Sequence, residues 1–226
     1  VYDYPYLSSS ANHIIDLTVG YSANSALSGA ASSQNAKKIN IYNQMAQVLV
    51  GYDESGNIRE FDRDGTLSTG TKLRECVFVN LARLITKDEV QKGSFIMTVA
   101  TGGTPAAPDF SSPLTIRDYT GATKYKTNSP AGEYGILYTG SAAVEGTGVG
   151  LLYYQAGVAV LTSSVFDGTF GGSGATYDTS SIDAVLSGSE ISSSCDGFRN
   201  RLNDLDVNNT TELNSTIYFC RANTSD

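Results

Sequence analysis

Apolar and polar residues alternate over much of the chain, and this alternation predicts β-strands. In residues 14–21, Ile15, Leu17 and Val19 point to one side and polar residues to the other, which indicates a half-buried strand. Similar patterns predict strands at residues 58–61, 74–85, 94–99, 114–119 and 215–221. After a polar reversal at residues 87–89, we expect the 94–99 strand to return beside the 74–85 strand.

The stretch 133–166 is the most sheet-prone part of the sequence. It holds three apolar runs, near residues 134–138, 149–154 and 158–161, separated by glycine-rich turns. Ala156 and Gly157 are placed to turn a tight hairpin between the last two runs. The stretch contains neither His nor Cys, so it favours a protein that builds a structure over one that performs catalysis.

One helix is predicted clearly, because apolar residues recur every three or four positions over residues 36–49 and Gly51 provides a stop. Its other face carries Asn40, Asn43, Gln44 and Gln47. Two interpretations of this amide-rich face remain open: a solvated face of a helix packed on a sheet, or a contact surface for a partner. Shorter helices are predicted at residues 182–186 and at 196–205, the latter with Asp196 as its N-cap.

These elements predict a mainly β fold, with β-sandwich-like antiparallel sheets, one amphipathic N-terminal helix and one or two short helices. An α+β fold is the alternative. The length of 226 residues suits one β-rich domain over residues 1–226, with a possible subdivision into 1–112 and 113–226. Both ends read as cuts, so we expect the chain to be part of a longer polypeptide.

Composition and charge narrow the classes of function. Charged residues make up 17 % of the chain, below the roughly 25 % of an average domain, while 23 Gly and 14 Tyr suit a β-rich extracellular or virion protein. The net charge of −8 argues against direct nucleic-acid binding. The only doubly basic step, Lys37 and Lys38, is expected on a solvated helix face. No apolar run reaches about 18 residues, so no membrane span is expected.

Residues that could perform chemistry are few. Cys76, Cys195 and Cys220 are odd in number and widely spaced, so we expect all three to be reduced, and Cys76 and Cys220 lie in apolar runs. They are too few for a structural zinc site. A Ser-His-Asp triad would depend on the single histidine, His13, and the chain has no G-x-S-x-G elbow.

Acidic pairs occur in turn-like clusters at Asp53/Glu54, Asp62/Asp64 and Asp88/Glu89, where side chains usually bond to the backbone. Asp62-x-Asp64-Gly65 resembles the start of a calcium loop but lacks the glutamate at its twelfth position, which favours a plain turn. We therefore expect no catalytic residue, no metal and no cofactor. A virion-borne glycosidase is the less favoured enzymatic alternative.

Several segments resemble a family of virion structural proteins from tailed bacteriophages, especially T4-like and marine myoviruses. They are KKINIYNQMAQVLVGYD (37–53), REFD (59–62), SPAGEYGILYTG (129–140), VGLLYYQAGVAVLTSSVF (149–166) and LNSTIYFCRAN (213–223). The resemblance covers most of the chain and carries no catalytic signature. It implies a non-enzymatic structural subunit of the tail, baseplate or neck, located in the virion, with copies of itself and other virion proteins as partners.

The aromatic N-terminus offers further interface candidates. Tyr2, Tyr4 and Tyr6 could pack against a neighbouring subunit, or could contact glycans in a fibre-like, host-binding or capsid-decorating module. Glycan binding has no other support in the sequence. The predicted interface therefore comprises these tyrosines together with Asn40, Asn43, Gln44 and Gln47.

Overall fold

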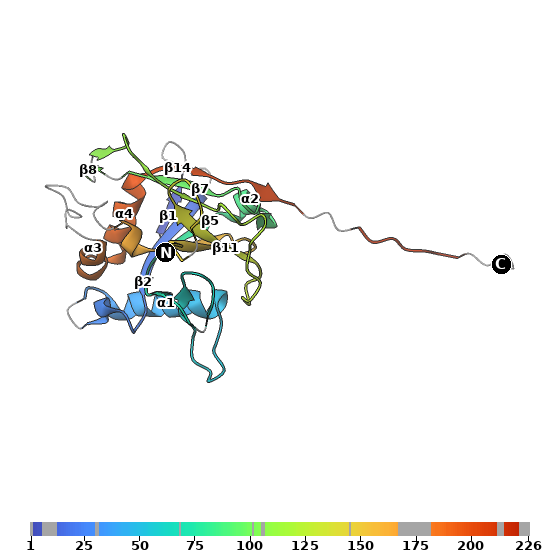
Figure 1. Ribbon diagram of the computed structural model, residues 1–226, viewed down its shortest axis with the longest axis horizontal. Coiled ribbons are helices and arrows are strands. Elements are labelled where there is room, and N and C mark those ends of the chain that lie inside the picture. The colour runs from blue at the N-terminus through green and yellow to red at the C-terminus, as the bar shows by residue number, and fades with distance from the viewer. Residues whose placement is uncertain are drawn as a thin grey trace.

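A computed structural model describes residues 2–5, 13–29, 32–67, 69–100, 102–104, 107–144, 146–166, 182–211 and 215–221. A nine-stranded antiparallel sheet forms most of the molecule (Figure 1). Its strands, in spatial order, are β1 (Tyr2–Pro5), β2 (His13–Tyr21), β5 (Glu75–Leu81), β13 (Val158–Thr162), β12 (Gly150–Tyr153), β11 (Tyr134–Thr139), β10 (Leu114–Arg117), β7 (Ile96–Val99) and β14 (Leu202–Asp206).

Smaller elements surround this sheet. Three two-stranded ribbons pair β3 (Phe61–Asp62) with β4 (Lys72–Leu73), β6 (Glu89–Val90) with β15 (Asn209–Thr210), and β8 (Gly102–Thr104) with β9 (Ala107–Asp109). The helices are α1 (Asn35–Leu49), α2 (Arg83–Thr86), α3 (Ile182–Gly188) and α4 (Ile191–Arg201), with short 3-10 turns η1 (Ala26–Ser28) and η2 (Ser163–Phe166). The prediction of a mainly β fold with few helices is confirmed.

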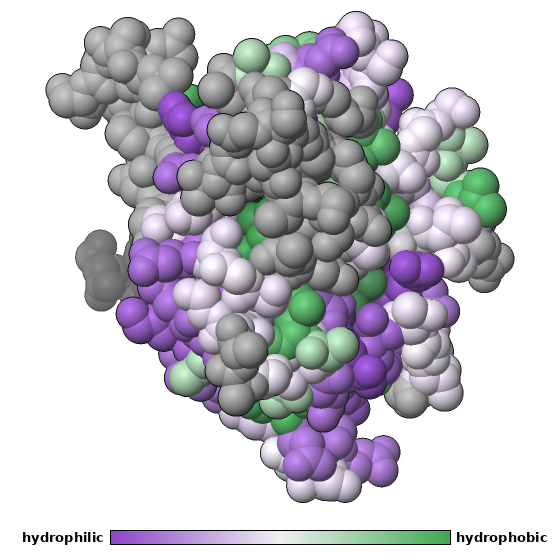
Figure 2. Space-filling view, turned by 90° about the vertical axis from the view of Figure 1, so that its left-hand side faces the viewer, coloured by the Kyte–Doolittle hydropathy of each residue, from purple (hydrophilic) through white to green (hydrophobic). Residues whose placement is uncertain are grey.

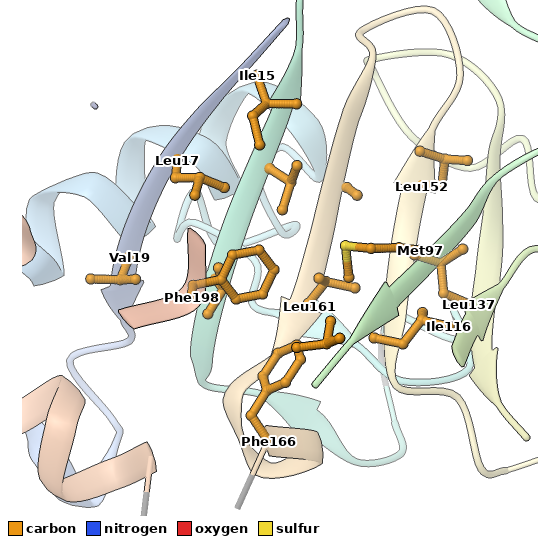
Figure 3. Close-up of a cluster of buried hydrophobic side chains, with 14 of the residues drawn as sticks. Ile15, Leu17, Val19, Met97, Ile116, Leu137, Leu152, Leu161, Phe166 and Phe198 are labelled. Carbon is orange, nitrogen blue, oxygen red and sulfur yellow. The ribbon is translucent and has the colours of Figure 1, made fainter. Parts of the chain in front are cut away.

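The sheet curls into a half-barrel, so that its inner face encloses one apolar core. Met97 of β7 and Leu161 of β13 belong to the same buried cluster, although three strands separate β7 from β13 in the sheet (Figure 3). Phe166 of η2 and Phe198 of α4 belong to the same cluster, and their ring centroids lie 5.4 Å apart. Burial of such side chains is the main source of stability for the fold.

The outer face of the sheet carries a second core under α1. Tyr42 and Ala46 of α1 are buried there against Phe61, with the Tyr42 and Phe61 rings 5.4 Å apart, edge to face. The Tyr42 hydroxyl donates to the Leu73 carbonyl and accepts from the Phe61 amide, so this buried polar group has hydrogen-bond partners within the core. The sheet is therefore covered on both faces, by α1 outside and by α4 inside.

The predicted strands at 14–21, 114–119 and within 133–166 are found, and the hairpin at Ala156-Gly157 is confirmed. Tyr153 pairs with Val158 across this turn, and Gly157 has a φ of +67°. Positive φ is strained for most residues and open to glycine, which explains the choice of residue at this position.

Three other strand predictions were wrong in part. β5 pairs with β2 and β13, whereas β7 pairs with β10 and β14, so the 94–99 segment does not return beside β5. β13 is buried at every position and suits the centre of the sheet, while β7 alternates between buried and half-buried residues. The 74–85 strand ends at Leu81, because residues 83–86 form α2; at residues 58–61, Ile58 makes one isolated bridge and Phe61 begins β3.

The end of the chain also differs from prediction. α4 begins at Ile191, so Asp196 lies inside the helix and is not its N-cap, and the residues from Leu202 form β14. Ile191, Cys195 and Phe198 are buried at helical spacing, but the serines between them concealed the pattern. Residues 215–221 pair with none of the described strands and so do not form the predicted closing strand.

Candidate interaction site

Residues 215–221, called the C-terminal arm from here on, extend away from the body of the molecule (Figure 1). All seven residues are exposed. Ile217, Tyr218 and Phe219 are 74 %, 83 % and 93 % exposed, respectively, although these are among the most frequently buried residue types. A run of three large apolar side chains in water is the least expected feature of the described surface.

The sequence of the C-terminal arm explains its extended form. It reads STIYFCR, which is rich in residues with high β-propensity and contains no Gly, Pro or carboxylate. Such a segment favours a strand, but no described strand lies beside it to accept its backbone hydrogen bonds. It therefore has the composition of a strand without the partner that a strand requires.

The body of the molecule distributes its exposed apolar residues differently. They are Val48, Tyr52, Leu84, Phe110, Tyr125 and Val144, each separate in the sequence. On the face seen in Figure 2, the hydrophobic residues outside the grey areas form small areas bordered by hydrophilic ones. Single exposed apolar residues are ordinary, whereas a continuous group usually marks an interaction site.

The base of the C-terminal arm is fixed to the body. β14 pairs with β7, and β15 pairs with β6 through Asn209 and Val90. The Asn209 side-chain amide also donates to the Ile85 carbonyl at 2.9 Å. The point from which the arm departs is therefore set by the sheet.

The sheet has two open edges in its described part, because β1 and β14 are each bonded on one side alone. β14 presents the exposed carboxylates Asp204 and Asp206, whereas the arm carries Arg221 and no acid. Open edges offer unpaired amides and carbonyls to any extended segment that approaches.

The predicted interface residues fall in two places. Tyr2 and Tyr4 belong to the edge strand β1, where they pair with Leu17 and Ile15, and their side chains are outside the description. Tyr6 lies outside the described residues.

On α1, the polar face predicted from the sequence is found. Asn40, Gln44 and Gln47 are exposed and Asn43 is half-buried, while the opposite side of the helix packs on the sheet. A role of this face in binding a partner stays a prediction. Lys37 is exposed as expected, but Lys38 is fully buried, because it shares the inward side of α1 with Tyr42 and Ala46.

Two of the acidic clusters bond to the backbone, as the sequence indicated. Asp53 accepts from the amides of Ser55 and Asn57 at 2.8 Å, and these bonds lower its pKa. Asp62 accepts from the amides of Asp64 and Thr66 and pairs with Lys72 at 2.6 Å. The Asp62 to Gly65 segment is a turn whose carboxylate is already occupied.

One buried polar cluster joins three segments. Asp118 is 2 % exposed and accepts from the Tyr154 hydroxyl at 2.8 Å and from the Gly93 amide at 2.9 Å. Next to it, Lys92 pairs with Glu133 at 2.6 Å and lies 5.6 Å from the Tyr154 ring. These contacts tie the end of β10 to β12 and to the turn after β6.

The three cysteines are free in the structure, as predicted. Burial raises the pKa of the Cys76 thiol well above its ordinary value and that of Cys195 to about 12. Cys220 is exposed on the C-terminal arm, although the apolar residues Ile217, Tyr218 and Phe219 precede it. The described residues contain no group of three or more His, Cys, Asp or Glu placed to hold a metal ion. The side chain of His13 is outside the description.

The chain matches no protein-family model, no curated protein and no solved structure at a significant level. Among the described helices, none combines the length and apolar character needed to cross a lipid bilayer.

Proposed function

We propose that the chain is a structural subunit of a tailed-phage virion, in the tail, baseplate or neck, and that it assembles with copies of itself through the C-terminal arm. The observation that carries the assembly role is the exposure of Ile217, Tyr218 and Phe219 on an extended segment. The virion setting rests on the resemblance of the five sequence segments given above.

The mode of assembly follows from the chemistry of the arm. An extended segment binds by adding a strand to an open sheet edge, where backbone hydrogen bonds give affinity and side-chain pockets give specificity. Every copy of the chain supplies such edges at β1 and β14. Burying each of the three apolar side chains contributes about 1.5–3 kcal/mol. Together with the backbone hydrogen bonds to the edge strand, this burial offsets the cost of ordering the segment, about 1–2 kcal/mol per residue.

The geometry also has a consequence for symmetry. An arm that leaves one copy and binds a different surface of the next makes a head-to-tail contact. Such contacts close into a ring when the rotation between copies allows it. Tail, neck and baseplate structures are built from rings, so this mode of binding suits the proposed location.

Sedimentation velocity over a range of concentrations tests the assembly role. We expect the wild-type chain to form oligomers, and the triple variant Ile217→Ser, Tyr218→Ser, Phe219→Ser to remain monomeric with an unchanged Tm. Leu84→Ser is the matched control, because Leu84 is 76 % exposed but lies on α2 of the body.

A wild-type chain that stays monomeric at high concentration contradicts self-assembly, and equal loss in the Leu84→Ser control contradicts the role of the arm. The virion setting has its own test. Purified particles of the phage encoding this chain should contain it in a copy number set by ring symmetry, and its absence from particles refutes that part of the proposal.

A further inference from the structure

A pocket of about 270 Å³ lies between the turn after β3, the connection from β10 to β11 and the connection from β11 to β12. Arg63, Lys124 and Lys126 line it together with Asp64. Three cations against one carboxylate make the described wall of the pocket positive, in a chain whose net charge is −8. A hollow lined by charges of one sign raises the local concentration of ions of the opposite sign, here anions.

Arg63 has an unsatisfied donor at this site. Its Nε is buried and has no hydrogen-bond partner in the described part of the chain. The side chain is confined, because its Cγ lies 3.5 Å from the position where a Cβ on Gly148 would stand. A buried donor without a partner is unfavourable in a folded protein, so the hydrogen-bonding capacity of this guanidinium is not used up by the described residues.

Lys126 is likewise held in place by its surroundings. Its side-chain carbons pack over Gly65, with Cγ 3.2 Å from the Cβ position of that glycine. A further cation, Arg117, is paired across the ladder with Tyr138 of the pocket wall and lies 5.2 Å from the Tyr119 ring. Lys126 and Arg117 are therefore positioned by packing.

We propose that this pocket binds a small organic anion, through a carboxylate or phosphate group held by Arg63, Lys124 and Lys126. Ile136 and Tyr138 form an apolar wall that would contact the uncharged part of the ligand. The volume suits a compact body such as one sugar ring. The inference does not depend on the C-terminal arm or on assembly.

Isothermal titration calorimetry at low salt tests the proposal, with inorganic phosphate and D-glucuronate as probes and D-glucose as the neutral control. We expect binding of at least one anion, weakened by added salt, and no binding of glucose. Lys124→Gln should weaken binding at least tenfold, because it removes a charge-assisted hydrogen bond to the anion. Lys37→Gln removes the same charge from an exposed position on α1 and should have no effect.

Each result decides the question. Binding of phosphate alone, or of glucuronate alone, supports the site and identifies the ligand's acidic group. Failure of both anions to bind, glucose binding equal to glucuronate binding, or equal weakening by Lys37→Gln would overturn it. Because Lys124 is exposed, its substitution leaves the fold intact, and a second variant, Arg63→Gln, checks the buried donor separately.

Discussion

The residue with the most unusual environment is Lys38, which is fully buried within α1. Its ammonium group donates to the carbonyl of Leu186 and, at 2.7 Å, to that of Ser189, at the end of α3. Carbonyls at a helix C-terminus lack intrahelical partners and carry partial negative charge, so a lysine is a suitable donor. This single side chain connects two helices that lie far apart in the sequence.

Burial lowers the pKa of Lys38 to about 8, from an ordinary value near 10.5. Between these values the unfolded chain holds a proton that the folded chain has released, so folding stability rises with pH. Between pH 8 and 10.5, we expect the free energy of unfolding of wild type to increase by on the order of 3 kcal/mol relative to that of Lys38→Met.

Urea denaturation of both proteins across that range measures this difference. Titrations of groups far from Lys38 occur in both proteins and cancel in the comparison. Lys37→Met is the matched control, because it removes the same charge from an exposed position of the same helix. If the difference in free energy of unfolding between wild type and Lys38→Met does not change with pH, the lysine is charged and well solvated in the folded state.

At the scale of elements, the approach of α1 to β2 depends on Gly20. A Cβ at this position would lie 2.6 Å from the Lys38 carbonyl oxygen and 3.0 Å from the Tyr42 amide nitrogen. Both are backbone atoms and cannot rotate away. Contacts this short force the helix off the sheet.

We therefore expect Gly20→Ala to destabilise the protein by about 1–3 kcal/mol. Gly29→Ala is the matched control, since a Cβ there meets nothing within 4 Å and φ is −64°. Thermal unfolding of the two variants gives the comparison. Equal Tm values would show that α1 tolerates a shift away from β2.

The elements that the sequence predicted well are those with local signals. Residues 133–166 formed three strands and a hairpin because their apolar runs, β-branched residues and turn glycine all lie within short windows. Pairing between distant strands has no such signal, which is why the neighbours of β5 were not predicted. The cationic pocket was missed for the same reason, since Arg63 and Lys124 come from connections about 60 residues apart.

The C-terminal arm was predicted as a strand because propensity reports what a segment favours and says nothing of whether a partner strand is present. The amide face of α1 was located correctly because helical periodicity alone fixes it. The buried Lys38 was missed because its acceptors, on α3, could not be anticipated from its own helix.

At the scale of the whole molecule, the reactivity of the Cys220 thiol measures directly whether the C-terminal arm is covered by a partner. It is the exposed cysteine, while Cys76 and Cys195 are buried. We expect one thiol per dilute chain to react rapidly with a maleimide and the other two to react after unfolding. On assembly, Cys220 should become protected by at least tenfold in rate, because a bound arm excludes the reagent.

Mass spectrometry of the labelled chain locates the reacted thiol, and Cys220→Ser should abolish the rapid phase. Protection that is absent in oligomers formed by wild type would show that assembly uses another surface. In that case, the amide face of α1 becomes the first surface to test.

The way in which β14 joins the arm has a mechanical consequence. β14 lies at the sheet edge, antiparallel to β7, and the arm continues in roughly the same direction (Figure 1). Tension along the arm therefore acts in shear, and the backbone hydrogen bonds between β14 and β7 share the load. In optical-tweezers experiments, we expect higher rupture forces for pulling along the arm than for peeling β14 sideways. A chain tethered in this way can resist sudden stretching along the arm.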